Sequence, residues 1–458
     1  MTKKFIILFV AAALLFIGGE LEKQAVASGT SGQEVLDMVQ AADGQEEFVE
    51  SISAGWTYVS PMPTPRMFLA AAESGGKIYA VGGMLPNYYV TNVVEAYDPQ
   101  TDTWSTKSPM PTSRSSMGIA VADGKIYVIG GYAQGYLSNR LEVYDPQTDT
   151  WSVRSSMPSS RDFLGAAAVA GKIYAIGGGR SVSNGHLVQV YDPQTNNWST
   201  KSPMPTSRYA MGITVVNGKI YTIGGGLVWT STATTTVEVY DPLTNSWSTK
   251  SPMPGARYRL AAVTGPDEKI YAIGGSPGGG SVVNKVQAYD PKTDTWSNAP
   301  YLPRPRWDLA AAVGRNSTIY AIGGYSLFNP HGCTNTVLAY SPVRIVSIDI
   351  KPGSYPNSIN LGSQGNVSVA IFSAADFDAT NVDPTTVTLE GASVRLKGKG
   401  IPMSSFEDVD GDGLLDIVVH VDTSALLISS GDTEAILEGE TFDGVRIRGT
   451  DTVRIVNE

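Results

Sequence analysis

The sequence predicts an all-β protein, and its composition, an internal repeat and its turn chemistry support this prediction. The 458 residues include 49 glycines and 27 prolines, but only 17% of them are charged. Charged residues normally make up about a quarter of a globular chain, so neither a disordered chain nor a coiled coil fits. Short apolar or alternating segments recur along the chain between clusters of glycine, proline and aspartate. This pattern indicates a packed, loop-rich β protein.

Three residue types recur in register and define six repeats. Gly-Gly pairs follow one another at intervals of 47 to 50 residues, and each has a tryptophan and an arginine at similar offsets. Because chance does not produce three interleaved series, each interval is one structural unit. The pairs begin at Gly82, Gly130, Gly177, Gly224, Gly274 and Gly323; the tryptophans are Trp56, Trp104, Trp151, Trp198, Trp247 and Trp296; the arginines are Arg66, Arg114, Arg161, Arg208, Arg257 and Arg306.

Each repeat predicts four short strands. In the second repeat, residues 117–121 are apolar, and Asp123-Gly124 supplies a tight hairpin turn into the β-branched and aromatic run 125–129. Residues 141–144 alternate as a half-buried strand does, and the next turn leads into a fourth strand around Trp151. Four antiparallel strands in about fifty residues are typical of a propeller blade. The sequence therefore predicts a six-bladed β-propeller over residues 55–342.

The repeat resembles the kelch motif. The residues that carry the resemblance are Tyr144-Asp145-Pro146, Trp151, Met157-Pro158, Arg161 and the strand 173–176 with Gly177-Gly178. The resemblance covers residues 55 to about 342 and implies a kelch propeller. There are two departures, because Ser341 replaces aspartate in the last Tyr-Asp-Pro and Leu302 replaces methionine in one Met-Pro.

The phase of the repeat predicts how the ring closes. Trp56 stands before any Tyr-Asp-Pro, whereas no tryptophan follows the last such segment, Tyr340-Ser341-Pro342. We therefore expect an N-terminal strand near Trp56 to complete the sixth blade. Such a strand covers an edge that would otherwise pair with other chains.

A ligand site is expected on one face of the propeller. If strands a to d of each blade run antiparallel, the b-c loops and the d-a connections share one end, and their sequences vary from blade to blade. The positions just after the recurring arginines, including Phe68 and Phe163, are rich in aromatic and charged residues. Aromatic rings with a few charged groups can stack on sugars or anchor peptides, although each residue could equally pack loops together. The candidate ligand residues are Asp162, Tyr209, Tyr258, Arg259, Trp307 and Asp308.

The six recurring arginines are expected to be structural. A residue that is needed in every blade is better explained by bonds to carbonyl groups at strand ends than by ligand binding.

The kelch resemblance also implies two possible enzyme activities. A copper centre of the galactose oxidase type needs two histidines, two tyrosines and a cysteine, whereas the chain has only His186, His331, His420 and Cys333. A sialic acid mutarotase-like activity, the stronger alternative, needs a sugar pocket with an acid or base, for which Asp162, Asp308 and Arg259 are available. No complete catalytic constellation is visible in the sequence, so non-catalytic binding is favoured over an enzyme.

Residues 343–458 lose the repeat and predict a β-sandwich of alternating strands. This segment holds 18 Asp and Glu against 8 Lys and Arg, so it accounts for the whole net charge of −10. Residues 348–354 and 440–444 resemble an accessory module of exported prokaryotic proteins, a resemblance that implies no activity. The acidic balance makes nucleic acid an unlikely partner and a cation a good candidate.

One acidic loop of this module predicts a calcium site. Carboxylates occupy positions 1, 3, 5 and 9 of the loop, Gly413 occupies position 6, and Leu414 offers a main-chain carbonyl. Such a set of hard oxygen ligands suits Ca²⁺, and it resembles the DxDxDG loops of integrin-type propellers and dockerins. Position 12 is Val419 where an EF-hand has glutamate, and a solvated acidic turn is the alternative. The predicted ligands are Asp408, Asp410, Asp412, Leu414 and Asp416.

The N-terminus predicts export. Lys3 and Lys4 precede an apolar run over residues 5–17, and Ala25-Val26-Ala27 offers a cleavage site. Residues 1–27 are therefore expected to be a signal peptide, with an uncleaved membrane anchor as the alternative. Residues 28–54 are expected to form an acidic linker or one short helix. The sequence thus predicts a secreted or cell-surface monomer that binds a glycan, a cell-wall polymer or a protein, with no transmembrane span after cleavage.

Overall fold

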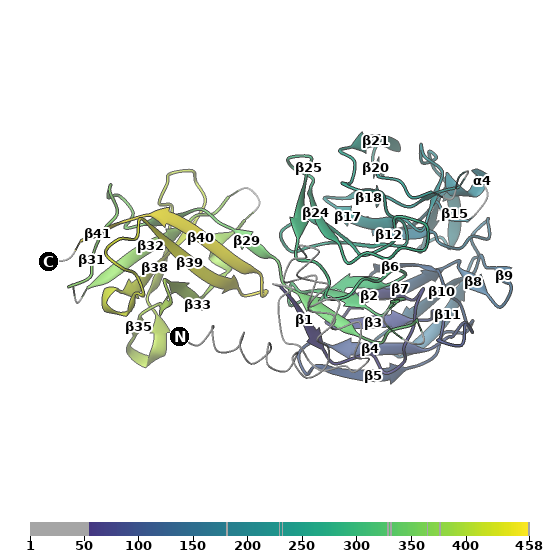
Figure 1. Ribbon diagram of the computed structural model, residues 1–458, viewed down its shortest axis with the longest axis horizontal. Coiled ribbons are helices and arrows are strands. Elements are labelled where there is room, and N and C mark those ends of the chain that lie inside the picture. Colours follow the sequence, from purple (N-terminus) through teal and green to yellow (C-terminus); the bar gives the residue numbers. More distant parts are fainter. Residues whose placement is uncertain are drawn as a thin grey trace, which may run out of the picture. The chain divides into compact units, whose positions relative to one another are not determined.

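The computed structural model describes residues 55–456, except positions 180, 181, 229, 231, 328, 330, 331, 364, 375 and 376. Within these ranges the protein is all-β, with six four-stranded blade sheets followed by one five-stranded and one further four-stranded sheet (Figure 1). The predicted signal peptide and acidic linker lie outside the described residues. No helix in the described ranges is long and apolar enough to cross a membrane.

Five blades are formed by consecutive segments of the chain. In the first blade β2 (Ala70–Ser74), β3 (Lys77–Val81), β4 (Val94–Asp98) and β5 (Thr103–Lys107) pair antiparallel in chain order. The innermost strands lie at the centre and β5 and β21 at the periphery (Figure 1). The next blades are β6 (Gly118–Ala122), β7 (Lys125–Ile129), β10 (Leu141–Asp145), β11 (Thr150–Arg154); β12 (Gly165–Val169), β13 (Lys172–Ile176), β14 (Val188–Asp192), β15 (Asn197–Thr200); β17 (Gly212–Val216), β18 (Lys219–Ile223), β20 (Val237–Asp241), β21 (Ser246–Lys250); and β22 (Ala261–Thr264), β23 (Ile270–Ile273), β24 (Val286–Asp290), β25 (Thr295–Ala299).

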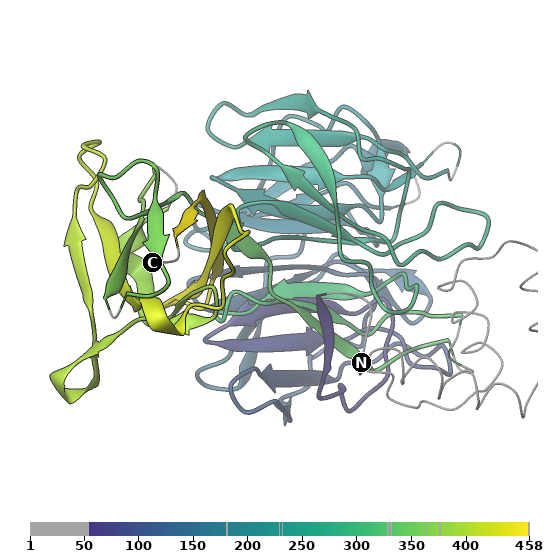
Figure 2. The same cartoon turned by 60° about the vertical axis from the view of Figure 1, so that its left-hand side comes forward.

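The sixth blade joins the two ends of the propeller. It consists of β26 (Ala310–Val313), β27 (Ile319–Ile322), β28 (Val337–Tyr340) and the N-terminal β1 (Trp56–Val59). Strand β1 pairs antiparallel with β28, with Trp56 opposite Tyr340, and Figure 2 shows the purple β1 beside the green strands of this blade. The predicted closure is confirmed, and the six-bladed ring leaves no open gap between its first and last blades.

Glycine is needed at the Gly-Gly pairs because the neighbouring blade lies too close to leave room for a side chain. Gly82 and Gly83 both have positive φ, 57° and 103°, a region that glycine adopts without strain. The N–H of Gly83 donates to the carbonyl oxygen of Arg114 in the next blade at 2.8 Å. A Cβ on Gly82 would lie 2.6 Å from that same oxygen. The equivalent bond recurs around the ring, and Gly324 donates to Arg66 to close it.

The recurring arginines tie the strands of each blade together. Arg114 is fully buried, and its Nη1 donates to the carbonyl oxygens of Gly130 at 2.6 Å and Arg140 at 3.2 Å. Its Nη2 forms an ion pair of 2.7 Å with the buried carboxylate of Glu142. The predicted structural role is confirmed, but the carboxylate partner was not predicted. The residues at this partner position in the six blades are Glu95, Glu142, Gln189, Glu238, Gln287 and Leu338.

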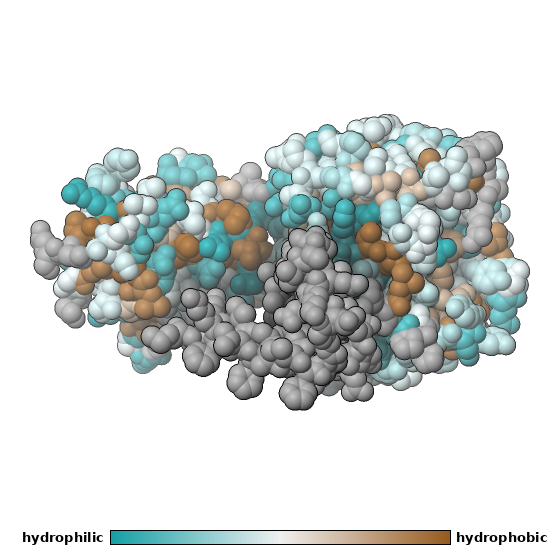
Figure 3. Space-filling model, viewed as in Figure 1, coloured by the Kyte–Doolittle hydropathy of each residue, from teal (hydrophilic) through white to brown (hydrophobic). Residues whose placement is uncertain are grey.

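Apolar side chains fill the spaces between blades. One cluster combines Tyr79 and Val81 of the first blade with Ile126, Val128 and Tyr144 of the second. Each blade is buried on both faces, which explains why its middle strands read as continuous apolar runs. Figure 3 shows one face of the molecule, where hydrophilic and neutral residues predominate on the propeller and hydrophobic residues occur in small groups.

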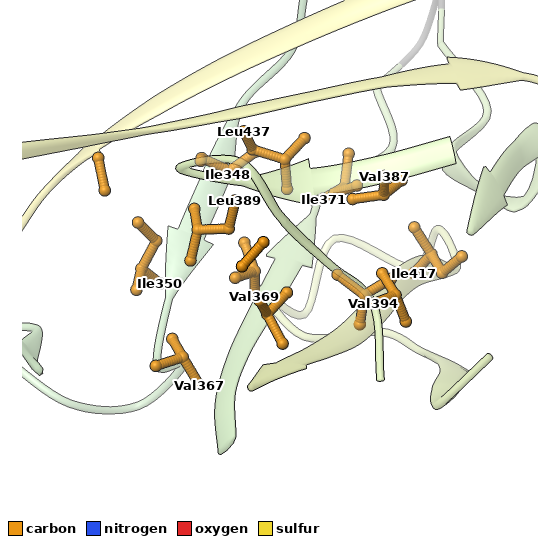
Figure 4. Packing of buried hydrophobic residues seen from close by; sticks show 14 of the residues in the cluster. Ile348, Ile350, Val367, Val369, Ile371, Val387, Leu389, Val394, Ile417 and Leu437 are labelled. Atoms are coloured by element: carbon orange, nitrogen blue, oxygen red, sulfur yellow. The ribbon is translucent and has the colours of Figure 1, made fainter. Parts of the chain in front are cut away.

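The C-terminal module is the predicted β-sandwich. Its core takes aliphatic side chains from both sheets, among them Ile350, Val369, Val387, Leu389 and Leu437 (Figure 4). One sheet has the order β29 (Val343–Ile345), β40 (Arg446–Thr452), β39 (Glu434–Thr441), β33 (Val382–Leu389), β34 (Ala392–Ser393), and the other β30 (Ile348–Ile350), β32 (Asn366–Ile371), β38 (Asp416–Asp422), β37 (Ser404–Glu407). Two short pairs complete it, β31 (Ser358–Asn360) with β41 (Arg454–Val456) and β35 (Leu396–Lys397) with β36 (Ile401–Pro402).

The residue that pairs with each buried arginine differs between blades, so the other blades suggest substitutions for a stability test. Glu142→Leu copies the sixth blade and leaves the charge of Arg114 buried without a counter-charge, so it should lower the free energy of unfolding by about 3–5 kcal/mol. Glu142→Gln copies the third and fifth blades, keeps an acceptor and should cost about 1 kcal/mol. Urea denaturation of the two variants measures the difference. Equal losses would show that the ion pair contributes nothing beyond packing.

Candidate functional site

The variable loops meet at one end of the propeller, as predicted. Short β-bridges join the chain just after the recurring arginine to the b-c loop of the same blade, for example Tyr258 to Ser276 and Trp307 to Tyr325. We call this end the ligand face. At the opposite end the turns are held by bonds between blades. The carboxylate of Asp102 accepts from the Ser60 N–H and from the Tyr97 hydroxyl, both at 2.8 Å.

A collar of six residues, one from each blade, surrounds the centre of the ligand face. Each collar residue lies two positions after a recurring arginine, and its N–H donates to the carbonyl of the collar residue in the preceding blade, at 2.7 to 3.0 Å. All six have φ between 49° and 57°, a left-handed conformation that costs energy in residues other than glycine. The collar residues are Phe68, Ser116, Phe163, Ala210, Arg259 and Asp308.

The collar encloses a small cavity, which we call the cup. Its volume is about 120 Å³. The residue after each collar residue is buried and adds an apolar layer to the cavity wall. These six residues are Leu69, Met117, Leu164, Met211, Leu260 and Leu309. The cup is therefore apolar at its base, and its polar groups come from the collar.

Arg259 and Asp308 supply the charges of the cup. Their side chains form an ion pair, with Arg259 Nη1 donating to Asp308 Oδ2 at 2.9 Å. The Asp308 side chain is 3% exposed, and burial raises its pKa to about 7 although Arg259 opposes the shift. The Arg259 side chain is 21% exposed. Its guanidinium carbon lies 5.0 to 5.6 Å from the ring centres of four aromatic residues, Phe68, Phe163, Tyr258 and Trp307.

The six predicted ligand residues fall into two groups. Arg259 and Asp308 line the cup, and half-buried Trp307 and Tyr258 stack against Arg259. Tyr209 and Asp162 are buried beside the collar; Tyr209 packs edge-on against Phe163 and Tyr258. The candidate set lacks Phe68 and Phe163, which also line the cup. Their shared offset of two residues from the recurring arginines is the sequence signal that identifies them.

The residues considered for a copper centre are dispersed. His186 Nδ1 lies 2.6 Å from the carbonyl oxygen of Met204 in the third blade, whereas His420 contacts Ser368 in the sandwich. Cys333 in the sixth blade is buried, and burial raises the pKa of its thiol to about 11. His331 lies outside the described residues.

The predicted calcium loop connects β37 to β38. Asp408, Asp410 and Asp416 each offer a carboxylate oxygen, and these oxygens lie within 4.8 Å of one another. Asp416 is buried and accepts the N–H groups of Ser373 and Val409 at 2.7 and 2.9 Å. Asp412 is not part of this group, and its carboxylate accepts instead from the N–H of Leu414 at 2.8 Å.

The donor set of this loop fits a hard divalent cation. Three carboxylates converge without a basic partner in the group, and each carboxylate oxygen has a second lone pair beyond the main-chain bonds. Oxygen ligands of this kind suit Ca²⁺. Asp408, Asp410 and Asp416 would hold the ion, and the further predicted ligands Asp412 and Leu414 would have to complete its shell.

The closed ring of four-stranded blades, with a buried arginine and a Gly-Gly pair in each, defines a β-propeller. Comparison with known families finds matches to kelch repeats along parts of the chain. Residues 9–225 match the family described as the KLHDC2/KLHL20/DRC7 Kelch-repeats domain, and residues 207–254 and 257–303 match the Kelch motif.

Two known proteins give further comparisons. The structure of YjhT is similar with a TM-score of 0.53 and 18% identity, covering 62% of this chain and 97% of that chain, a likeness that shows the fold. The F-box protein AFR of Arabidopsis thaliana is 45% identical over 49 residues, which are 10% of this chain and 13% of that protein. The chain thus spans about an eighth of the length of this curated relative.

The raised pKa of Asp308 predicts a pH dependence of stability. The folded state holds the Asp308 proton more tightly than the unfolded chain, so this residue's contribution to stability falls as pH rises from about 4 to 7 and is constant above. The slope from one such group is at most about 1.4 kcal/mol per pH unit.

The variant Asp308→Asn removes this contribution and serves as the reference. Urea denaturation at pH 5, 6 and 8 should show the wild type losing stability relative to Asp308→Asn between pH 5 and 7. Parallel pH profiles would mean that the buried carboxyl titrates normally.

Proposed function

We propose that the protein is an exported recognition protein that binds a carbohydrate or protein ligand on the ligand face of its propeller. The collar carries this proposal. Six residues with strained backbone hold Arg259, Asp308 and a group of aromatic rings in one fixed arrangement at the mouth of the cup. Strained conformations persist where the surrounding structure enforces them, and they cluster at functional sites. Rigid placement also reduces the entropy that is lost when a ligand binds.

The path of the chain supports the choice of face. Strand β1 begins opposite the end of β28, at the turn end of the sixth blade. Trp56 and Tyr340 therefore lie at the end of the sixth blade opposite to the ligand face.

Calcium and export belong to the same proposal. The converging carboxylates of Asp408, Asp410 and Asp416 support a Ca²⁺ site that stiffens the loop between β37 and β38. The basic, apolar and small-residue order of residues 1–27 supports export by a signal peptide to the exterior, where calcium is abundant.

One observation favours a second candidate, a carbohydrate-active enzyme related in function to the sialic acid mutarotases. Asp308 has a pKa near neutrality and lies in a cavity beside Arg259, as expected of an acid-base catalyst. Proton nuclear magnetic resonance of sugar anomer exchange distinguishes the candidates. An enzyme would accelerate exchange and lose this activity in Asp308→Asn, whereas a binding protein would leave the exchange rate unchanged.

The aromatic residues of the ligand face should contribute directly to binding. Trp307→Ala and Tyr258→Ala each remove a ring that borders Arg259, and each should weaken binding by about 1–3 kcal/mol because buried aromatic contacts dominate such interfaces. A glycan array and a protein-binding screen with the wild type identify the ligand, and biolayer interferometry then compares the variants.

The chain offers a matched control at the opposite end. Leu243 is 96% exposed in a turn between β20 and β21, so Leu243→Ala should leave binding unchanged. Loss of binding in Leu243→Ala, with normal binding in Trp307→Ala and Tyr258→Ala, would show that the other end carries the site.

Calcium should stabilise the folded protein, because it binds the folded loop and not the unfolded chain. Millimolar calcium should raise the melting temperature of the C-terminal transition, with apparent affinity in the range of about 10⁻⁴ to 10⁻³ M that is typical of extracellular sites. Calorimetry of the full chain, with and without a chelator, measures the shift. Asp410→Ala should abolish it, whereas Asp432→Ala, an exposed acidic residue outside the group, should retain it. An unchanged shift in Asp410→Ala would contradict the site.

A further inference from the structure

We propose that the b-c loops of the first two blades bind an uncharged polysaccharide chain at a second site on the ligand face, away from the cup. Three exposed tyrosines would contact its sugar rings. We call these residues, Tyr88, Tyr89 and Tyr136, the tyrosine platform. This inference rests on the proposed ligand face and deepens it, because it names the class of ligand.

Exposed hydrophobic side chains are concentrated in these two loops, which cover residues 84–93 and 131–139. Nine large hydrophobic residues are exposed in the described part of the propeller, and four of them lie in these loops: Tyr88, Tyr89, Tyr136 and Leu137. The side chains of the platform are 54% to 70% exposed, so their rings are accessible to a ligand. Exposed apolar surface that gathers in one area is typical of a binding site.

Main-chain hydrogen bonds place the two loops on either side of one short segment. The N–H of Arg114 donates to the carbonyl of Thr91 in the first loop at 3.2 Å. The next residue, Ser115, exchanges hydrogen bonds of 2.8 and 3.0 Å with Tyr132 of the second loop. A ligand that contacts both loops therefore has to extend over two blades. The site suits a chain of several sugar units better than a single sugar.

Both loops are ordered by main-chain hydrogen bonds. In the first loop the N–H of Tyr88 donates to the carbonyl of Leu85 at 2.9 Å. The second loop is a hairpin of β8 (Tyr132–Ala133) and β9 (Tyr136–Leu137), and both residues of its two-residue turn have positive φ. Figure 1 shows this hairpin projecting from the propeller. A tyrosine on an ordered backbone has few torsions left to restrict, so little entropy is lost when it binds.

The composition of the loops favours an uncharged ligand. Neither range contains Lys, Arg, His, Asp or Glu, and the polar side chains are those of tyrosine, asparagine, glutamine, serine and threonine. These groups form neutral hydrogen bonds, and a tyrosine ring adds a flat apolar face. A sugar ring is complementary to them, because it has a face of C–H groups and a rim of hydroxyls. An anionic polymer or an anionic membrane would find no basic partner in these loops.

Affinity electrophoresis of the full chain tests this inference. The gels contain mixed-linkage β-glucan, xyloglucan, galactomannan or dextran, and polygalacturonate is the charged comparison. At least one neutral polymer should retard the wild type, whereas polygalacturonate should not. Tyr88→Ala and Tyr136→Ala each remove a stacking ring and should weaken retardation at least about fivefold. Tyr136→Phe keeps the ring and should stay within about threefold of the wild type.

Tyr355 provides the matched control. It is a tyrosine of the C-terminal module with a 94% exposed side chain, so Tyr355→Ala should leave retardation unchanged. Oligosaccharides cut from the bound polymer add a second measurement. Their affinity should increase with the number of sugar units, because only a longer chain reaches both loops. Melting curves verify that each variant folds.

The inference fails if no neutral polymer retards the folded wild type, or if Tyr88→Ala and Tyr136→Ala migrate as the wild type does. It also fails if Tyr355→Ala loses binding with them, or if the platform serves phosphatidylcholine vesicles or a peptide instead of the polymers. Trp307→Ala separates it from the proposed ligand face. If only Trp307→Ala weakens polymer binding, the platform is wrong while the ligand face stands. If only the platform variants lose binding and Trp307→Ala and Tyr258→Ala bind every ligand normally, the platform stands and the site around Arg259 fails.

Discussion

The buried arginine of each blade connects strands within the blade, the neighbouring blade and the collar. Its side chain joins two strands within the blade through their carbonyls, and its own carbonyl accepts from the Gly-Gly pair of the neighbouring blade. Burying a guanidinium costs free energy, and burial lowers the pKa of Arg306 to about 10. This free-energy cost is offset because the arginine donates hydrogen bonds to carbonyls at the strand ends, which would otherwise lack a partner. Two residues further along, the same segment of chain supplies the collar.

This arrangement separates the structural and the variable parts of the ligand face. The main chain of the collar is held by hydrogen bonds that do not depend on the side chains at its six positions. These side chains differ from blade to blade, from Ala210 to Arg259. The fold thus provides a fixed frame whose chemistry depends on only a few residues.

The sequence predicts the blades and their closure because both depend on local and periodic signals. Turn residues and alternating strands define each blade, and the isolated Trp56 indicates which strand completes the ring. The carboxylate partners of the arginines were not predicted, since Glu142 occupies a strand position that elsewhere holds glutamine or leucine. The offset from the arginines marks the collar positions, but their left-handed backbone was not predicted, because it arises only when six blades meet.

The predicted calcium loop likewise depends on both local spacing and a residue that is distant in the sequence. The carboxylates at positions 1, 3 and 9 lie close together, and Asp416 also accepts the N–H of Ser373, a residue distant in the sequence. Asp412 satisfies its nearest N–H and does not join the group.

A recognition role is consistent with the energetics of the cup. An active site for proton transfer needs one titrating group in contact with its substrate, and Asp308 could serve, but its carboxylate is already engaged by Arg259 and hardly exposed. The more exposed group is the guanidinium of Arg259, which lies among aromatic rings. The collar therefore exposes a rigid hydrogen-bond donor and keeps the titrating acid behind it, an arrangement better suited to holding a ligand than to transforming one.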